Sequence, residues 1–322
     1  GKIVLIESGI PYTKNDPELA KLEPYSYHRY KFSRARELGA AGLLYVGLVA
    51  NPNTSYIDGF VYVHVSESMA DELFRSTGRK FSELKQEITA SMKPISMELH
   101  RKVAMTASTR HYPEARSCNV IGIIPGSDPV LKDEAIILGA HLDGVGSPGK
   151  PFPGALDNGT GVATLLTLAW RLQNYRGEPA IEIVLLNGED YYANTGQVLY
   201  LEKLDAEGVL LAVNTDGAGY REGGTTYACF ELTDELKTIV EDVLGGRQAM
   251  KATGPWPQSD HMIFVLNGIP ALAFTSEETD KVASIAHTAR DRIEMVSLTR
   301  LEEIVLAIEV FLSELNGVFG NG

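Results

Sequence analysis

The stretch that decides the fold is residues 134–172, EAIILGAHLDGVGSPGKPFPGALDNGTGVATLLTLAWRL. It starts with an apolar run of strand length, EAIILGA, and passes through the turn GALDNGTG. It then continues with apolar residues at helical spacing, namely Val162, Leu165, Leu166, Ala169 and Leu172. Because the strand is apolar on both faces, it predicts a sheet that is covered by helices on both sides.

The same alternation of strand and helix continues along the chain. Further apolar runs predict strands at 119–126 (NVIGIIPG), 181–187 (IEIVLLN), 209–214 (VLLAVN) and 271–276 (ALAFTS). Helices are predicted near 160–174, 197–204, 233–244, 260–266 and 299–315. The last helix is expected to begin with a capping box formed by Thr299 and Glu302. The sequence therefore predicts an α/β fold.

Residues of metal-binding type stand just beyond these predicted strands or close to them: His141, Asp157, Asp190, Asp216 and His287. In open α/β sheets, side chains at the carboxyl ends of the strands converge in one crevice. With three carboxylates, a single divalent cation leaves an excess negative charge that is costly in a poorly solvated pocket, whereas two cations and a hydroxide balance it. Imidazole and carboxylate without thiolate fit catalytic zinc, and manganese or cobalt stays open.

Each of these residues also has a structural alternative. Asp157, followed by Asn158 and Gly159, has the pattern of a turn and helix N-cap. Glu189 and Asp190 fit solvated loop acids, and Asp216 before a glycine fits a turn. Taken singly, the alternatives are at least as good as metal ligation.

Six segments resemble the co-catalytic di-zinc exopeptidase family that includes bacterial leucyl aminopeptidases and glutamate carboxypeptidase. The segments are GAHLDGVG, GALDNGTG, LLNGED, NTDG, SDHMIF with NGIPALAF, and HTARD, in order between about Cys118 and Leu315. The resemblance implies a mixed, mostly parallel sheet between helices, of the zinc aminopeptidase and phosphorylase/hydrolase-like type. Together with the strand-end placement, this order favours metal ligation over the separate alternatives.

The resemblance also implies the roles of the site residues. Two Zn²⁺ ions are expected, with ligands His141 and Asp216 for the first, Asp190 and His287 for the second, and Asp157 bridging both with a water or hydroxide. Glu189 is expected to be the general base that takes the water proton and passes it to the departing amine. Asp143 is expected to assist catalysis by accepting the other N–H of the His141 ring.

The chain departs from the family pattern in the catalytic region. Many relatives carry Tyr before the last histidine, where this chain has Ala286, so the oxyanion partner must be zinc alone or a group such as Tyr191, Tyr192 or Tyr220. Asp190 stands where Glu is commoner, and YYANTGQ replaces a small glycine-rich turn after it.

Four residues are candidates for substrate binding: His261, Tyr191, Tyr220 and Trp256. For the segment around His261, a role behind the metal ligands or at the substrate competes evenly with simple helix capping by Ser259 or Asp260. Asp291 is expected to orient the His287 loop without a direct part in catalysis.

The amino-terminal third reads differently from the rest. GKIVLIE and RARELGAAGLLYVG resemble the protease-associated domain that is often inserted into this peptidase family. A smaller, β-rich domain of this type is expected over 1–105, truncated at its start, with the di-zinc catalytic domain over 113–322. A polar linker is expected within 102–116. The small domain has the family role of shaping substrate access, with a passive lid as the alternative.

Composition excludes several classes of protein. The 322 residues carry a net charge of −13, so the phosphates of nucleic acids and anionic membranes would be repelled. No apolar run has the length of a membrane span, and two cysteines make no disulfide framework. The chain opens on the strand KIVLI without a signal peptide, as though upstream residues had been removed. Family resemblance alone implies secretion or a periplasmic location.

These observations predict a zinc-dependent exopeptidase, first of all an aminopeptidase acting on peptides. A metallo-carboxypeptidase or a dipeptidase of the same family is the alternative. Arg221, Arg290 and Arg292 lie close enough in sequence to ligand residues to clamp a terminal carboxylate. Glutaminyl cyclisation, seen in single-zinc relatives, is disfavoured by the five-residue ligand set. A binding protein without catalysis is disfavoured because every ligand and the base are present.

Overall fold

The computed structural model describes residues 1–11, 22, 25–47, 56–108, 110, 112, 114–147, 150–190 and 195–319. The chain divides into two compact units, Gly1–Glu114 and Ala115–Gly322, and the division falls within the stretch predicted to be a linker. In the described residues, no helix combines the length and the apolar character that crossing a membrane requires.

The first unit is built on a three-stranded parallel sheet, β1 (Ile3–Glu7), β2 (Gly42–Val46) and β3 (Val61–Val65), in that order. Its helices are α2 (His28–Glu37), α3 (Glu67–Phe74) and α4 (Phe81–Ser91). Phe32 of α2 packs against Tyr45 on one side of the sheet, while Phe74 and Phe81 pack with Val46 on the other. The small sheet is therefore covered by helices on both faces.

The second unit is built on a seven-stranded sheet with the order β11-β10-β12-β9-β5-β8-β4. Its strands are β4 (Val120–Ile124), β5 (Ala135–His141), β8 (Ala180–Leu186), β9 (Val209–Thr215), β10 (Thr225–Phe230), β11 (Met250–Ala252) and β12 (Ala271–Ser276). The central strands β12, β9, β5 and β8 are parallel, β4 pairs antiparallel with β8, and β10 pairs antiparallel with β12. The predicted α/β fold with a mixed, mostly parallel sheet is confirmed.

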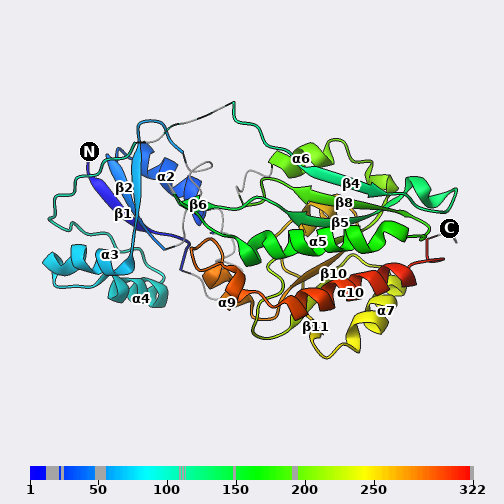
Figure 1. Cartoon of the computed structure of the whole chain (residues 1–322). Coiled ribbons are helices and arrows are strands. Elements are labelled where there is room, and N and C mark those ends of the chain that lie inside the picture. Colours follow the sequence, from blue (N-terminus) through cyan, green and yellow to red (C-terminus); the bar gives the residue numbers. More distant parts are fainter. Residues whose placement is uncertain are drawn as a thin grey trace. The chain divides into compact units, whose positions relative to one another are not determined.

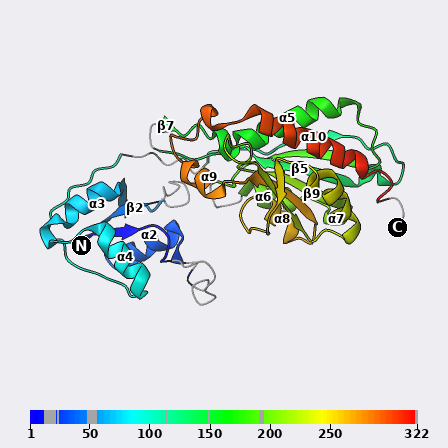
Figure 2. The same ribbon diagram turned by 90° about the horizontal axis from the view of Figure 1, so that it is seen from below.

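Helices cover both faces of this sheet (Figure 1). They are α5 (Thr160–Arg171), α6 (Thr195–Leu201), α7 (Asp234–Val240), α8 (His261–Val265), α9 (Thr279–Ile285) and α10 (Leu298–Glu314). Side chains alternate along β5, so Ile136 and Leu138 join the core beneath α5, α7 and α10, whereas Ile137 joins the core beneath α6 and α8. Figure 2 shows α5 and α10 side by side along the sheet.

Several elements differ from the sequence predictions. The strands β10 and β11 and the helices α4 and α9 were not anticipated. The capping box predicted for Thr299 is wrong, because α10 already begins at Leu298 and the Ser297 hydroxyl accepts the Arg300 N–H at 3.4 Å. The backbone N–H of Ser297 donates to Gly219 O at 2.9 Å, which fixes the entry of the chain two residues earlier.

Candidate metal centre

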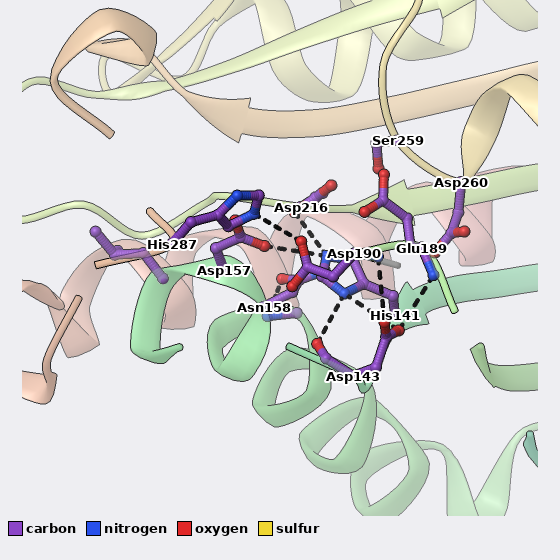
Figure 3. A network of polar contacts seen from close by, with 12 residues as sticks. His141, Asp143, Asp157, Asn158, Glu189, Asp190, Asp216, Ser259, Asp260 and His287 are labelled. Atoms are coloured by element: carbon purple, nitrogen blue, oxygen red, sulfur yellow. Dashed lines mark hydrogen bonds and ion pairs between the residues drawn. The ribbon is translucent and has the colours of Figure 1, made fainter. Parts of the chain in front are cut away.

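The strand ends of the second unit bring the five residues of metal-binding type together (Figure 3). His141 is the last residue of β5, Asp216 directly follows β9, and Asp190 lies four residues beyond β8. Since β8, β5 and β9 are adjacent and parallel, their carboxyl ends lie at the same edge of the sheet. Asp157 comes from the short π-type turn before α5, and His287 from the loop after α9.

Asp157 lies at the centre of this group. Its Oδ1 is 3.2 Å from His141 Nε2, and its Oδ2 is 3.0 Å from His287 Nε2. His141 Nε2 also lies 3.4 Å from Asp216 Oδ1, and His287 Nε2 lies 2.6 Å from Asp190 Oδ1. Ligand atoms of His141, Asp157 and Asp190 all lie within 4.8 Å of one another. One carboxylate thus faces two His–Asp pairs, one on each of its oxygens.

The turn that carries Asp157 is capped by its neighbour. Asn158 Oδ1 accepts the Gly161 N–H at 3.0 Å, and Asn158 Nδ2 donates to Thr215 O at 2.9 Å. A Cβ at Gly161 would lie 2.4 Å from Asn158 Oδ1, so only glycine fits this approach of α5 to β9. The capping role left open for Asp157 therefore belongs to Asn158, and both oxygens of Asp157 face the histidines.

The segment that carries Glu189 and Asp190 is held by Asp143. Asp143 Oδ1 accepts the N–H groups of Gly188 at 2.8 Å and Glu189 at 3.3 Å, and Oδ2 accepts the Asp190 N–H at 3.1 Å. His141 Nδ1 lies 3.2 Å from the Asp143 carbonyl oxygen and 3.8 Å from the carboxylate. The geometry thus differs from the expectation for Asp143: the carbonyl is the nearer partner of the ring, and the carboxylate holds the backbone.

The electrostatics of the group suit cations. Burial by itself lowers the pKa of both histidines, but the carboxylates outweigh it: Asp216 and Asp157 raise that of His141 well above its usual value, and Asp157 and Asp190 raise that of His287 to about 10. Burial by itself would raise the pKa of Asp157, and the two histidines hold it below its usual value. The negative charge of the carboxylates is balanced either by protons on the histidines or by metal cations. Metal binding should therefore release protons.

The donor set fits zinc by its chemistry. Imidazole nitrogens and carboxylate oxygens are zinc ligands, and within the described residues the buried Nε2 of His141 faces Asp157 at 3.2 Å and Asp216 at 3.4 Å without a well-directed hydrogen bond. A cation between His141, Asp157 and Asp216 would satisfy that nitrogen.

Two further carboxylates stand beside the ligands (Figure 3). Burial, together with Asp216, Asp260 and Asp190, raises the pKa of Glu189, although His141 opposes the shift. Burial also raises the pKa of Asp260 to about 7, while Gln197 Nε2 donates to its Oδ1 at 2.8 Å. The region is therefore rich in acids that need compensating positive charge.

Comparison with known families decides the relationship. The sequence model described as "Peptidase family M28" matches residues 119–312, which include all five of these residues. The chain belongs to peptidase family M28. Among curated relatives of this M28 peptidase, aminopeptidase YwaD of Bacillus subtilis (strain 168) is 24% identical over 211 residues. The match covers 62% of this chain and 44% of the relative, so the chain spans less than half of that protein's length.

Solved structures share the fold of this M28 peptidase. The structure of BSAP, a zinc aminopeptidase from Bacillus subtilis, matches with a TM-score of 0.65 and 19% identity, over 98% of this chain and 70% of that one. An aminopeptidase from Aneurinibacillus sp. strain AM-1 matches with a TM-score of 0.60 and 19% identity, over 98% and 69%. At these identities the likeness shows the fold.

The M28 chain places its candidate substrate residues in different surroundings. His261 is buried, its Nε2 lies 3.0 Å from Trp256 O, and its ring packs against the rings of Phe230 and Trp256. Tyr220 is buried and packs with Leu156 beside the turn that carries Asp157. Tyr191 lies outside the described residues, as does Tyr192.

Neither Ser259 nor Asp260 caps α8 with its side chain. Ser259 Oγ accepts from Asn214 Nδ2 at 2.9 Å, and Asp260 makes no side-chain cap because its Oδ1 accepts from Gln197. Both side chains therefore contact interior polar groups beside the candidate metal centre, in line with the alternative to capping, although their partners Asn214 and Gln197 were not foreseen. At the turn before α5, the sequence did carry a signal: Asn158, next to Asp157, is itself a residue type that caps helices.

Proposed function

We propose that this chain is a zinc-dependent aminopeptidase that removes amino-terminal residues from peptides. The observation that carries the proposal is the shared carboxylate: Asp157 contacts His141 through one oxygen and His287 through the other. Such an arrangement supports one metal position with His141 and Asp216 and a second with His287 and Asp190. Family membership supports the same reaction class.

Zinc bound by these residues would supply a readily deprotonated water and a polarised scissile carbonyl. Glu189 is assigned the proton transfer: its carboxylate accepts the proton of the attacking water and then gives it to the departing amine. The pKa of Glu189 is raised by burial and by its acidic neighbours, and bound cations would act in the opposite direction. Asp143 fixes the backbone of Glu189 and Asp190, so base and ligand keep a constant spacing.

Charge favours a free amino terminus over a free carboxylate. With cations bound, the raised pKa values of Glu189 and Asp260 are opposed, and their carboxylates together with Asp143 add negative charge around the ligand set, which suits a substrate ammonium group. The three arginines that could clamp a carboxylate are engaged elsewhere, each donating to a backbone carbonyl of a nearby segment: Arg221 to Glu294, Arg290 to Ser284 and Arg292 to Ala289. These contacts support aminopeptidase over carboxypeptidase.

The test is hydrolysis of matched peptides with free or blocked ends by the metal-depleted and the zinc-reloaded chain. We expect zinc to restore cleavage, and only where the amino terminus is free. Glu189→Gln should keep its zinc and lose about 10²- to 10⁴-fold in kcat, because the proton acceptor is gone. Cleavage only at free carboxyl termini would instead establish a carboxypeptidase, and zinc binding without any turnover would establish a binding protein.

We also propose that residues 1–105 form a protease-associated type of domain and that the protein acts in the periplasm or after secretion. Both proposals rest on family resemblance. A fractionation experiment on the source cells, with activity of the natural protein as the readout, tests the location.

A further inference from the structure

Asp291 is bound to the turn that carries the bridging ligand. It lies four residues beyond His287 and is fully buried. Its Oδ1 accepts the Leu156 N–H at 2.7 Å, its Oδ2 accepts the Asp157 N–H at 3.1 Å, and its carbonyl oxygen accepts the Ala155 N–H at 3.3 Å. Three consecutive backbone N–H groups of the Asp157 turn thus donate to this one residue.

We propose that Asp291 is a positioning residue that locks the bridging carboxylate of Asp157 to the His287 loop and so sets the spacing of the two metal positions. The inference rests on the proposed function, because it assumes that two metals bind. It goes beyond the expectation that Asp291 orients its own loop, since the main contacts of its side chain are with the turn before α5.

The geometry explains why the contact matters for two metals in particular. A bridging carboxylate must present one oxygen to each metal, and Asp157 does so toward His141 at 3.2 Å and His287 at 3.0 Å. His287 lies in a loop with a left-handed backbone (φ 58°) and is the more exposed of the two histidines. Asp291 belongs to that loop, so its hydrogen bond from the Asp157 N–H fixes the position of Asp157 relative to His287.

The chemistry of the two oxygens suggests a selective variant. Asp291→Asn keeps the size of the side chain but replaces one acceptor oxygen with an NH₂ donor. That donor must face either the Leu156 N–H or the Asp157 N–H, so one of the two hydrogen bonds is replaced by a donor–donor contact. The turn can then shift away from His287 while α5 and the sheet stay in place.

The chain offers a matched control in Asp128. Its Oδ1 accepts the N–H groups of Val130 at 2.7 Å and Leu131 at 3.0 Å, so it too holds two consecutive backbone amides. Asp128 precedes β5, whereas the candidate metal centre lies at the other end of that strand. Asp128→Asn therefore makes the same substitution at a residue that holds backbone amides away from the metal-binding segments. Because Asp128 uses only Oδ1 and Asn keeps one amide oxygen, this variant controls for the lost carboxylate charge, and only Asp291→Asn creates a donor–donor contact.

The experiment is a Zn²⁺ titration of the full chain against a competing chelator, with Co²⁺ absorption and magnetic coupling as a second readout. We expect Asp291→Asn to weaken one of the two metal steps about 10- to 100-fold and to reduce the coupling between two Co²⁺ ions. Asp128→Asn should bind both metals like the wild-type chain. Wild-type affinity and coupling in Asp291→Asn, or an equal loss in Asp128→Asn, would overturn the proposal.

Two additions keep the result decisive. If Asp291→Asn does not fold, Asp291→Glu keeps the charge and pushes the turn outward by one methylene, so a selective tenfold loss supports the proposal and unchanged binding contradicts it. Peptide hydrolysis is measured separately. A wild-type chain that binds two metals but cleaves no peptide refutes the aminopeptidase, while a selective metal loss in Asp291→Asn still supports the positioning role.

Discussion

The two sheets of this protein use the polar residues at their strand ends in opposite ways. In the first unit, Glu7 ends β1 and pairs with Lys85 at 2.6 Å, and Ser66 after β3 caps α3 by accepting the Met69 N–H at 3.2 Å. In the second unit, the residues at the ends of β5 and β9, His141 and Asp216, face each other and Asp157. Strand-end polar residues serve local structure in one unit and a shared centre in the other.

The two units differ in which residues accept the backbone N–H groups near the strand ends. In the second unit, backbone N–H groups donate to Asn158, Asp143 and Asp291, which leaves the carboxylates proposed as metal ligands free to face the histidines. The comparison teaches that a metal centre of this kind needs a supporting set of polar residues that satisfy the backbone. A ligand that also had to cap a helix could not present both oxygens to metals.

The sharpest way to break the comparison is to remove the local cap and keep the ligand. Asn158→Ala leaves the Gly161 N–H and Thr215 O without their partner, both in a buried region. We expect the free energy of unfolding to fall by about 1–3 kcal/mol. Denaturant unfolding with a chelator present measures this loss without any contribution from bound metal.

The ligand beside it supplies the control. Asp157→Ala removes the bridging carboxylate but leaves the cap. Zn²⁺ binding should be lost, and the chelated protein should lose only the contacts of Asp157 with His141 and His287. Retention of Zn²⁺ binding by Asp157→Ala, or its loss in Asn158→Ala, would show that capping and ligation are not divided between these neighbours.

A second prediction concerns acidic residues. Glu7 of the first unit is paired with Lys85, whereas Asp260 of the second unit is buried. Burial raises the pKa of Asp260 from its usual 3.8 to about 7. A raised pKa means that the protonated carboxyl stabilises the fold in full below pH 3.8, and that this stabilisation is lost as the pH rises through 7. With a chelator present, Asp260→Asn should therefore be more stable than wild type at pH 8, by about 1 kcal/mol, and closer to it at pH 5.

Thermal unfolding at the two pH values measures this effect. Asp128→Asn should instead be less stable than wild type by the same amount at both pH values, because backbone N–H groups lower the pKa of Asp128 and its ionised form stabilises the fold in full above the usual pKa of 3.8. A stability of Asp260→Asn relative to wild type that does not change with pH would refute the prediction.

The smallest expected effect lies in the first unit. Ser66→Ala removes the side-chain cap of α3 and should cost about 0.5–1 kcal/mol, because the Met69 N–H then has only water as a partner. The Zn²⁺ affinity of the full chain should be unchanged. A change in zinc binding would show that this strand-end residue also supports the metal centre, against the contrast between the two sheets.

Much of the fold could be predicted because the central strands are continuous apolar runs. The strands β5, β8, β9 and β12 are buried on both faces, and burial of this kind is visible in the sequence. β10 begins with two threonines and β11 has three residues, so neither stands out from loops by hydrophobicity. At α10, Ser297 and Thr299 both suit an N-cap, and only the tertiary contact of Ser297 with Gly219 decides between them.

The candidate site, too, has a part that could be predicted from the sequence and a part that could not. The five residues of metal-binding type could be selected because strand ends converge and because their side-chain types are distinctive. The grip of Asp143 on residues 188–190 could not, because backbone N–H groups leave no mark in a sequence. The link between Gln197 and Asp260 joins residues that are far apart in the chain and polar in an ordinary way.

The hold of Asp143 on backbone amides has a consequence for how such a centre can change over time. Every residue except proline offers an N–H, so this anchor is indifferent to the side chains of the segment that it holds. Asp190 can therefore be replaced by a longer acid while Asp143 still holds the backbone of the segment. The hydrogen bonds of Asp143 thus allow the proposed ligand side chains to vary, because they depend only on the backbone.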